Sequence, residues 1–229
     1  MKLFNPKSGN LDRIKIKPFK LEKEIQNLVE SNVPSLFELE FIKSELSYGN
    51  FRFDTLCFDK EINSFVIIEY KKGTSYSVID QGYTYLSLLL NNKSDFILEY
   101  NESLDRNIKR NEVDWSQSKV IFISPQFSSY QRNSVNFKNL PFELWEITRY
   151  SNDLIGLNKI STDSDVDISS TVTNNDDGGI VKQVSKEIIH YDEKYHLYKN
   201  KNRPESIIEL YRRLKERILE IGDNIDVKF

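Results

Sequence analysis

Residues 51–90 read FRFDTLCFDKEINSFVIIEYKKGTSYSVIDQGYTYLSLLL, and this stretch places charged side chains inside otherwise apolar sequence. The apolar run after residue 63 leads directly into Glu69, Tyr70 and Lys71. The two-residue period of a β-strand puts Glu69 and Lys71 on one face, together with every second apolar residue of the run. We therefore expect a buried strand face that ends in two opposite charges.

The polar residues 59–63, DKEIN, separate this run from an earlier strand-like run that contains Asp54. The pattern predicts an antiparallel hairpin that brings Asp54 beside Glu69. Two neighbouring carboxylates raise each other's pKa unless a cation compensates, and their hard oxygen atoms suit Mg²⁺ or Mn²⁺. We expect Asp54, Glu69 and the backbone carbonyl of Tyr70 to hold the metal, while Lys71 steadies a phosphate or the attacking water. The alternative is a strand end whose solvated charges pair across the hairpin.

Residues 77–90 predict a helix after this strand. Val78, Gln81, Tyr85 and Leu88 follow the helical period, so Gln81 lies one turn from Tyr85 among apolar neighbours.

Together these residues resemble the PD-(D/E)XK nuclease superfamily, which has an acid, an acid-X-lysine triplet at a strand end and a following helix. The residues that carry the resemblance are Asp54, Glu69-Tyr70-Lys71 and Gln81. The longer pattern RFDTL, VIIEYK and VIDQGYTYLSLLL is similar to a group of uncharacterised microbial proteins with a nuclease-like domain followed by a small domain of unknown function. The resemblance covers about residues 18–158 and 187–229, and Phe53 stands where the family's nominal proline would be.

The resemblance implies an α/β fold, a restriction-endonuclease-like mixed β-sheet flanked by helices, with a C-terminal helical segment added. It also implies a Mg²⁺-dependent deoxyribonuclease that uses Asp54, Glu69, Lys71 and Gln81. Families of this fold often place a helical glutamate at the metal site. Glu24, in a helix expected over residues 19–33, matches that position, although a solvated helix flank is the alternative. Resemblance to mismatch and resolvase nucleases makes Glu45, near the end of a strand expected over residues 37–47, a second acidic candidate.

The composition divides the chain into three parts. Residues 1–160 form the nuclease-like domain, in which further strands are expected at residues 95–100, 119–124, 142–150 and 154–160, and a helix at residues 127–136. Residues 161–186 are expected to be an acidic flexible linker, since residues 161–180 contain five aspartates and no Lys or Arg. Residues 187–229 form a C-terminal helical segment with an apolar stripe between Pro204 and Ile221. That stripe packs on the nuclease body, begins a second domain, or forms a homodimer.

Charge and composition limit which partners and which cellular location are expected. The net charge is −3, but it is −3 + 5 = +2 without the acidic tract, and residues 1–23 carry seven Lys/Arg against two acids. A basic arm of this kind can follow a phosphate backbone, so DNA is the expected partner. No run approaches the roughly 18 apolar residues of a membrane span, and the single cysteine excludes an internal disulfide, so a cytoplasmic protein is expected.

The alternative function is a catalytically inactive nucleic-acid-binding or assembly module on a nuclease fold. The presence of Asp54, Glu69, Lys71 and Gln81 favours the enzyme, because a binding module has no use for an acid pair beside a lysine.

Overall fold

The computed structural model describes residues 2–7, 9–73, 77–135, 140–161, 176–189, 191, 193–198 and 204–221. Contacts along the chain divide it into two units, Met1–Ile188 and Ile189–Phe229. The strands of the first unit are β1 (Phe4–Lys7), β2 (Asn10–Arg13), β3 (Glu40–Tyr48), β4 (Phe51–Asp59), β5 (Ser64–Tyr70), β6 (Lys119–Ser124), β7 (Phe142–Arg149) and β8 (Ile155–Lys159). Its helices are α1 (Glu22–Glu30), α2 (Val33–Phe37), α3 (Val78–Asn91), α4 (Lys93–Leu104), α5 (Ser129–Ser134) and α6 (Asp176–Glu187), with single 3-10 turns at Arg110–Glu112 and Trp115–Gln117.

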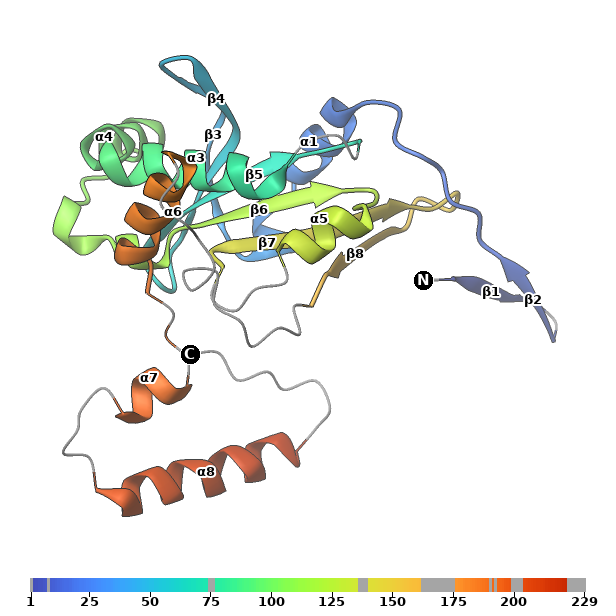
Figure 1. The fold of residues 1–229 in the computed structure, drawn as a ribbon. Coiled ribbons are helices and arrows are strands. Elements are labelled where there is room, and N and C mark those ends of the chain that lie inside the picture. The colour runs from blue at the N-terminus through green and yellow to red at the C-terminus, as the bar shows by residue number, and fades with distance from the viewer. Residues whose placement is uncertain are drawn as a thin grey trace. The chain divides into compact units, whose positions relative to one another are not determined.

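The first unit is built on a six-stranded sheet with the order β3-β4-β5-β6-β7-β8 (Figure 1). Strands β3, β4 and β5 are antiparallel, β5, β6 and β7 are parallel, and β8 returns antiparallel to β7. The β4–β5 ladder runs from the Thr55–Ile68 pair to the Asp59–Ser64 pair, so residues 60–63 form the turn. The structure confirms the predicted hairpin and the predicted fold class, a mixed β-sheet flanked by helices.

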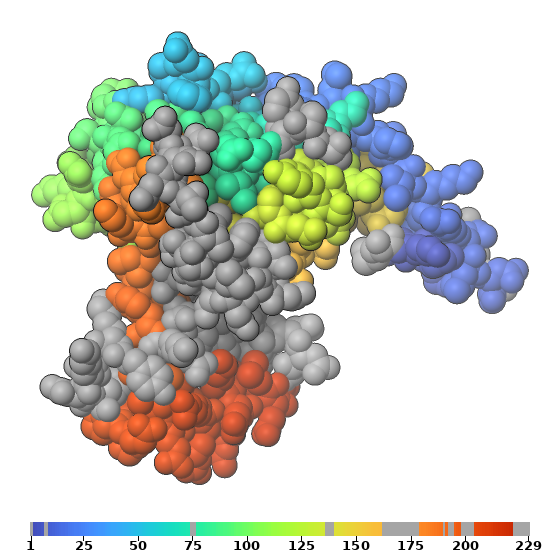
Figure 2. Space-filling view, in the orientation of Figure 1, coloured from blue at the N-terminus to red at the C-terminus, as the bar shows by residue number. Residues whose placement is uncertain are grey.

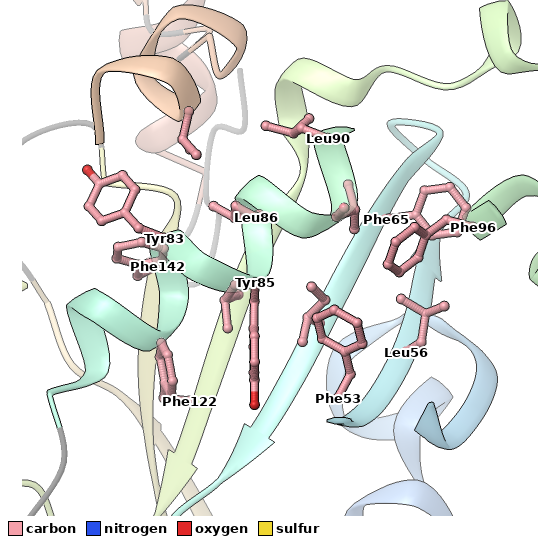
Figure 3. Close-up of a cluster of buried hydrophobic side chains, with 14 of the residues drawn as sticks. Phe53, Leu56, Phe65, Tyr83, Tyr85, Leu86, Leu90, Phe96, Phe122 and Phe142 are labelled. Atoms are coloured by element: carbon pink, nitrogen blue, oxygen red, sulfur yellow. The ribbon is translucent and has the colours of Figure 1, made fainter. Parts of the chain in front are cut away.

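Both faces of the sheet are covered, and β5 is therefore buried along its whole length. Phe65 and Ile67 belong to an aromatic-rich core beneath α3 and α4, part of which Figure 3 shows. The alternate residues Val66 and Ile68 belong to a second core, which contains Ile25 of α1. A continuous apolar run, rather than strict alternation of apolar and polar residues, is typical of a central strand with helices on both sides.

Two sequence predictions are corrected. Residues 95–100, predicted as a strand, lie inside α4, because Phe96 and Tyr100 face the core at helical spacing while Leu98 is exposed. The predicted linker 161–186 overlaps α6, whose buried Val184 packs in the first core and whose Glu187 forms an ion pair with Lys93. Apolar residues at helical spacing attach this part of the acidic segment to the core, whereas residues 162–175 lie outside the described residues.

The second unit contains α7 (Glu193–Tyr198) and α8 (Glu205–Leu219), the latter in red in Figure 2. Helix α8 begins after Pro204, as predicted, and Ile208 is buried. Leu210 and Leu214, which belong to the predicted apolar stripe, are exposed. None of the helices in the described ranges has the length and the hydrophobicity that crossing a membrane requires.

Candidate active site

The candidate site lies where β4 and β5 meet α3. Asp54 immediately precedes the Thr55–Ile68 pair of the hairpin ladder, which puts it across from Glu69. The Tyr70 N–H donates a 3.0 Å hydrogen bond to Asp54 Oδ2. The antiparallel hairpin therefore brings together two acids that are fifteen positions apart in the sequence.

Glu69 is buried, with 5% of its surface exposed, and its two carboxylate oxygens have different surroundings. Oε1 accepts hydrogen bonds from Lys71 Nζ at 2.9 Å and from Gln81 Nε2 at 2.6 Å. Oε2 is buried and accepts no hydrogen bond from any residue that the structure describes. A buried oxygen without a partner carries a free-energy cost that a bound cation or water would remove.

Helix α3 presents Gln81 to this carboxylate. The helix begins after Ser77, whose side chain accepts a hydrogen bond from the Asp80 N–H, and it approaches the sheet closely at Gly82. A Cβ atom at Gly82 would lie 2.6 Å from the Phe142 ring, so glycine permits this approach. The next turn of the helix supports the Gln81 amide, which also donates to the Tyr85 hydroxyl at 2.7 Å.

The electrostatics of the two acids follow from burial and proximity. Burial raises the pKa of Asp54, although the hydrogen bond from the Tyr70 N–H and the charge of Lys71 oppose the shift. Burial also raises the pKa of Glu69, and the charge of Asp54 raises it further, against the lowering effect of Lys71. Lys71 and the more distant charge of Arg52 therefore compensate the two partly desolvated carboxylates only in part.

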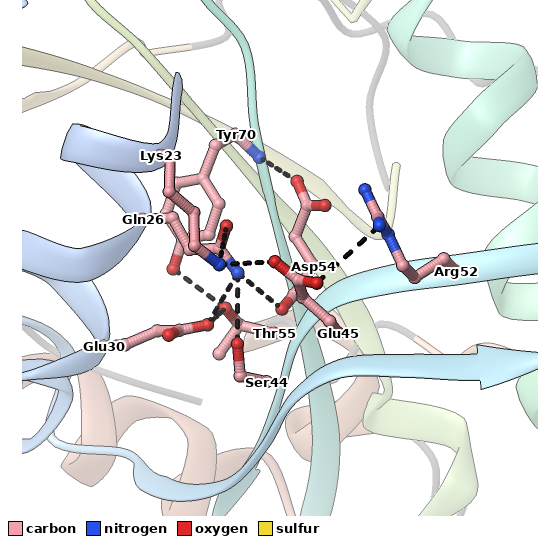
Figure 4. A network of polar contacts seen from close by, with 9 residues as sticks. All are labelled: Lys23, Gln26, Glu30, Ser44, Glu45, Arg52, Asp54, Thr55 and Tyr70. Atoms are coloured by element: carbon pink, nitrogen blue, oxygen red, sulfur yellow. Dashed lines mark hydrogen bonds and ion pairs between the residues drawn. The ribbon is translucent and has the colours of Figure 1, made fainter. Parts of the chain in front are cut away.

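A buried polar network holds the hairpin from the other face of the sheet (Figure 4). Gln26 of α1 donates to the backbone carbonyl of Asp54 at 3.1 Å and to Glu30 at 2.9 Å. Glu30 also accepts a hydrogen bond from Thr55 at 2.7 Å, and the Thr55 hydroxyl lies 3.0 Å from the Tyr70 hydroxyl. Through these contacts α1 positions the backbone at both Asp54 and Tyr70.

Glu24 and Glu45, the two acids expected from resemblance, contact basic residues outside the Asp54–Glu69 pair. Glu24 forms an ion pair with Arg149 at 3.0 Å. Glu45 forms ion pairs with Lys23 and Arg52, and its backbone has a positive φ of 53° within β3. That left-handed conformation is costly for a residue other than glycine.

A further acid of α1, Glu22, was not among the predicted site residues. Its charge contributes to the raised pKa of Asp54, and its carboxylate accepts a 2.7 Å hydrogen bond from the Lys72 N–H. The buried face of α1 consists of Ile25, Gln26 and Val29, whereas the predicted stripe began at Leu21, which is exposed. Glu22 lies in the first turn of α1 and its side chain is exposed, whereas that of Glu24 is half-buried.

The oxygen atoms present fit one hard cation. Glu69 Oε2 has no described donor, and Asp54 retains Oδ1 besides the oxygen bonded to Tyr70. No cluster of three or more His, Cys, Asp or Glu side chains suited to a metal occurs in the part of the chain that the structure describes. The remaining ligands would have to be a backbone carbonyl, water or a substrate phosphate, which is the usual way in which Mg²⁺ is bound in phosphate-transferring enzymes.

Comparison with known proteins identifies one clear relative. An uncharacterized protein of Haemophilus influenzae is 46% identical over 227 residues, which are 99% of this chain and 74% of that protein. No protein-family model matches the chain.

Solved structures show only a limited likeness to this chain. A repair endonuclease from Pyrococcus abyssi is 17% identical with a TM-score of 0.32, over 57% of this chain and 48% of that one. An EndoMS complex with double-stranded DNA is 16% identical with a TM-score of 0.32, over 57% and 47%. Pyrococcus furiosus SfsA in complex with Ca²⁺ is 12% identical with a TM-score of 0.32, over 66% and 76%. This chain thus spans about half the length of the first two, and likenesses this low carry no conclusion about activity.

Proposed function

The chain belongs to the same family as the uncharacterized Haemophilus influenzae protein, and we propose that it is a metal-dependent endonuclease that hydrolyses phosphodiester bonds in DNA. The observation that supports this proposal most directly is the state of Glu69. Its buried carboxylate directs one oxygen at Lys71 and Gln81 and leaves the other without a hydrogen bond from the described residues, beside a second acid. A structural ion pair would have both oxygens satisfied, whereas a metal-binding carboxylate keeps one available.

Each residue has a distinct role in the proposed reaction. Asp54, Glu69 and the Tyr70 carbonyl would hold Mg²⁺ or Mn²⁺, and the bound ion would acidify a water and neutralise charge on the phosphate. Lys71 would orient the attacking water or the phosphate with its ammonium group. Gln81 is a positioning residue, because its hydrogen bond to Glu69 Oε1 fixes the rotation of that carboxylate and so the direction of Oε2.

The test is a cleavage assay with the full chain and Mg²⁺ or Mn²⁺ over single-stranded, duplex, branched and mismatched DNA, with an EDTA control. We expect metal-dependent products from at least one substrate. Binding to DNA without cleavage of any substrate, in either metal, would instead support the inactive nucleic-acid-binding module.

A homodimer is part of the proposal. Helix α8 carries exposed Leu210 and Leu214 on its apolar stripe, and an exposed stripe of this kind favours association. Light scattering on the full chain should give the mass of a dimer, and Leu210→Lys with Leu214→Lys should return it to a monomer. A monomeric full chain would reject this part of the proposal without affecting the assignment of the active site.

A further inference from the structure

A cleft lies at the carboxyl end of β5, next along the chain from the candidate active site. None of the roles assigned above uses it. Its volume is about 360 Å³, and the residues that matter for its chemistry are Lys17, Pro18, Phe19, Lys72, Pro125 and Arg149. This volume is near the lower end of the roughly 300–1,000 Å³ typical of small-ligand sites.

The cleft adjoins the carboxyl end of β5. Lys72 follows Lys71 directly, so their Cα atoms are about 3.8 Å apart. The Lys71 N–H donates to the Ile123 carbonyl of β6 at 2.8 Å, and Pro125 comes two residues later on that strand's continuation. Because β5, β6 and β7 are parallel, their carboxyl ends lie at one edge of the sheet, where ligands of α/β proteins commonly bind.

The other wall of the cleft comes from the N-terminal segment, which the end of β7 holds in place. The Lys17 N–H donates to the Arg149 carbonyl at 2.8 Å. The Arg149 guanidinium donates to the backbone carbonyls of Lys17 at 3.3 Å and Pro18 at 3.0 Å, and it lies 4.5 Å from the centre of the Phe19 ring. With Glu24 as its ion-pair partner, Arg149 is committed to building the wall.

The lysines of the cleft remain available to a ligand. Neither Lys17 nor Lys72 forms an ion pair with a carboxylate in the described ranges of the chain. Lys72 Nζ donates to the Lys20 carbonyl, which leaves its positive charge unmatched. Part of the wall is apolar, with Pro18 and Pro125 among the lining residues, and Gln126 and Thr148 add polar groups. A ligand suited to this cleft therefore has a flat apolar part and an anionic part.

We propose that the cleft binds one unpaired nucleotide of a DNA strand whose neighbouring phosphate reaches the Asp54–Glu69 site. An apolar wall can support a base, and the two lysines can contact the phosphates next to it, as in single-strand-binding grooves. The volume of about 360 Å³ accepts one base with its sugar, and a base can lay its face against a protein wall only where it is not stacked inside a duplex. This inference rests on the proposed nuclease function, since it names the substrate class of the same site. Single-stranded DNA, or DNA with an unpaired segment, is then the preferred substrate.

The test measures binding in EDTA, where no turnover is required. Fluorescence anisotropy would compare a labelled single-stranded oligothymidine with a blunt duplex of equal length, for the wild-type chain, for Lys17→Gln/Lys72→Gln and for Lys60→Gln. Lys60 is the matched control, because it is an exposed lysine in the β4–β5 turn that pairs with Glu40. Circular dichroism and thermal melting would confirm that all three proteins are folded.

We expect the wild type to bind the single strand more tightly than the duplex. The double variant should lose about tenfold in single-strand affinity. The slope of its log binding constant against log salt concentration should be smaller by about 1.4, or roughly 0.7 for each of two lost phosphate contacts. Lys60→Gln should bind like the wild type. Equal affinities of the double variant and Lys60→Gln, or tighter binding of the duplex, would overturn the inference. A failure of cleavage with this binding pattern intact would count only against the nuclease function.

Discussion

Glu69, near the end of β5, and Glu143, near the start of β7, are two largely buried glutamates, and their surroundings shift their pKa values in opposite directions. Although burial disfavours its charge, Glu143 is held by Lys119 at 3.0 Å, Lys159 at 3.1 Å and the Trp145 indole N–H at 2.8 Å, which together lower its pKa to about 2. Glu69 has one lysine, one amide and a neighbouring acid, and its pKa is raised.

The difference separates a structural glutamate from a candidate functional one. Both oxygens of Glu143 have partners on β6, β7 and β8, so its charge contributes to holding the start of β6 and β7 and the end of β8 together. The negative charge of the Glu69 carboxylate is incompletely compensated. Binding of a cation would therefore increase the stability of the folded protein at neutral pH. Burial alone therefore does not mark a functional acid, whereas a raised pKa beside a second acid makes Glu69 a candidate for one.

The largest expected effect is on catalysis. Glu69→Gln or Asp54→Asn should lower the cleavage rate by about 10³-fold or more, because each removes a metal-binding charge while keeping the side-chain shape. Lys71→Ala should also be inactive but should still bind Mg²⁺. Glu143→Gln, assayed at a temperature at which it remains folded, is the matched control and should retain activity. Unchanged turnover in any of the first three variants would reject the assigned site.

The effects of Glu69→Gln and Glu143→Gln on the free energy of unfolding should be the reverse of their effects on cleavage. Glu143→Gln should lower the free energy of unfolding at pH 7 by roughly 3 kcal/mol, the equivalent of a pKa shift of just over two units, because it leaves two lysines without their carboxylate. Glu69→Gln should cost far less, or stabilise the fold, since it removes an under-compensated charge. Urea unfolding of the two variants beside the wild type measures both values. An equal loss in both would mean that Glu69 is also a structural ion pair.

The loss of stability at acid pH should depend on Glu143. Its folded-state pKa lies below its unfolded value, so its contribution is complete above about pH 4.3 and is lost as the pH falls towards 2. Between pH 5 and pH 3 the wild type should lose roughly 2 kcal/mol from this group. Glu143→Gln should lack that part of the loss. Parallel pH profiles for the wild type and the variant would contradict the low pKa.

The smallest effect concerns metal and proton binding at the site itself. Mg²⁺ at ten times its dissociation constant should stabilise the wild type by about 1.4 kcal/mol, seen as a rise in Tm, and should leave Asp54→Asn unchanged. Without metal, Asp54→Asn should be more stable than the wild type at pH 8, and the advantage should fade as the pH falls, because the raised pKa of Asp54 makes its ionised form the costly one. A Mg²⁺ shift of the same size in the variant would place the ion elsewhere.

Local patterns in the sequence were sufficient for most of the first unit. The hairpin of β4 and β5, helix α3 and strands β6 to β8 were predicted close to their observed bounds, because each has a clear period and a turn or cap at its ends. Residues 95–100 were mispredicted, since a short apolar run fits a strand or a buried helix equally well. In α1 the buried face includes Gln26, which the predicted stripe lacked, and leaves out Leu21. Glu24 was predicted from the resemblance and stays a prediction.

The sequence by itself determined which acids, lysine and amide are available at the end of β5, and that Glu69 and Lys71 share a strand face. Only the tertiary structure decided which hydrogen bonds and ion pairs these side chains form. Contacts between segments distant in the chain determine the partners of Glu69 and Glu143 and the ion pair of Glu24 with Arg149. Such contacts also form the cleft between the N-terminal segment and β7. Desolvation and hydrogen-bond geometry arise from such packing, and they set the pKa values that distinguish the two glutamates.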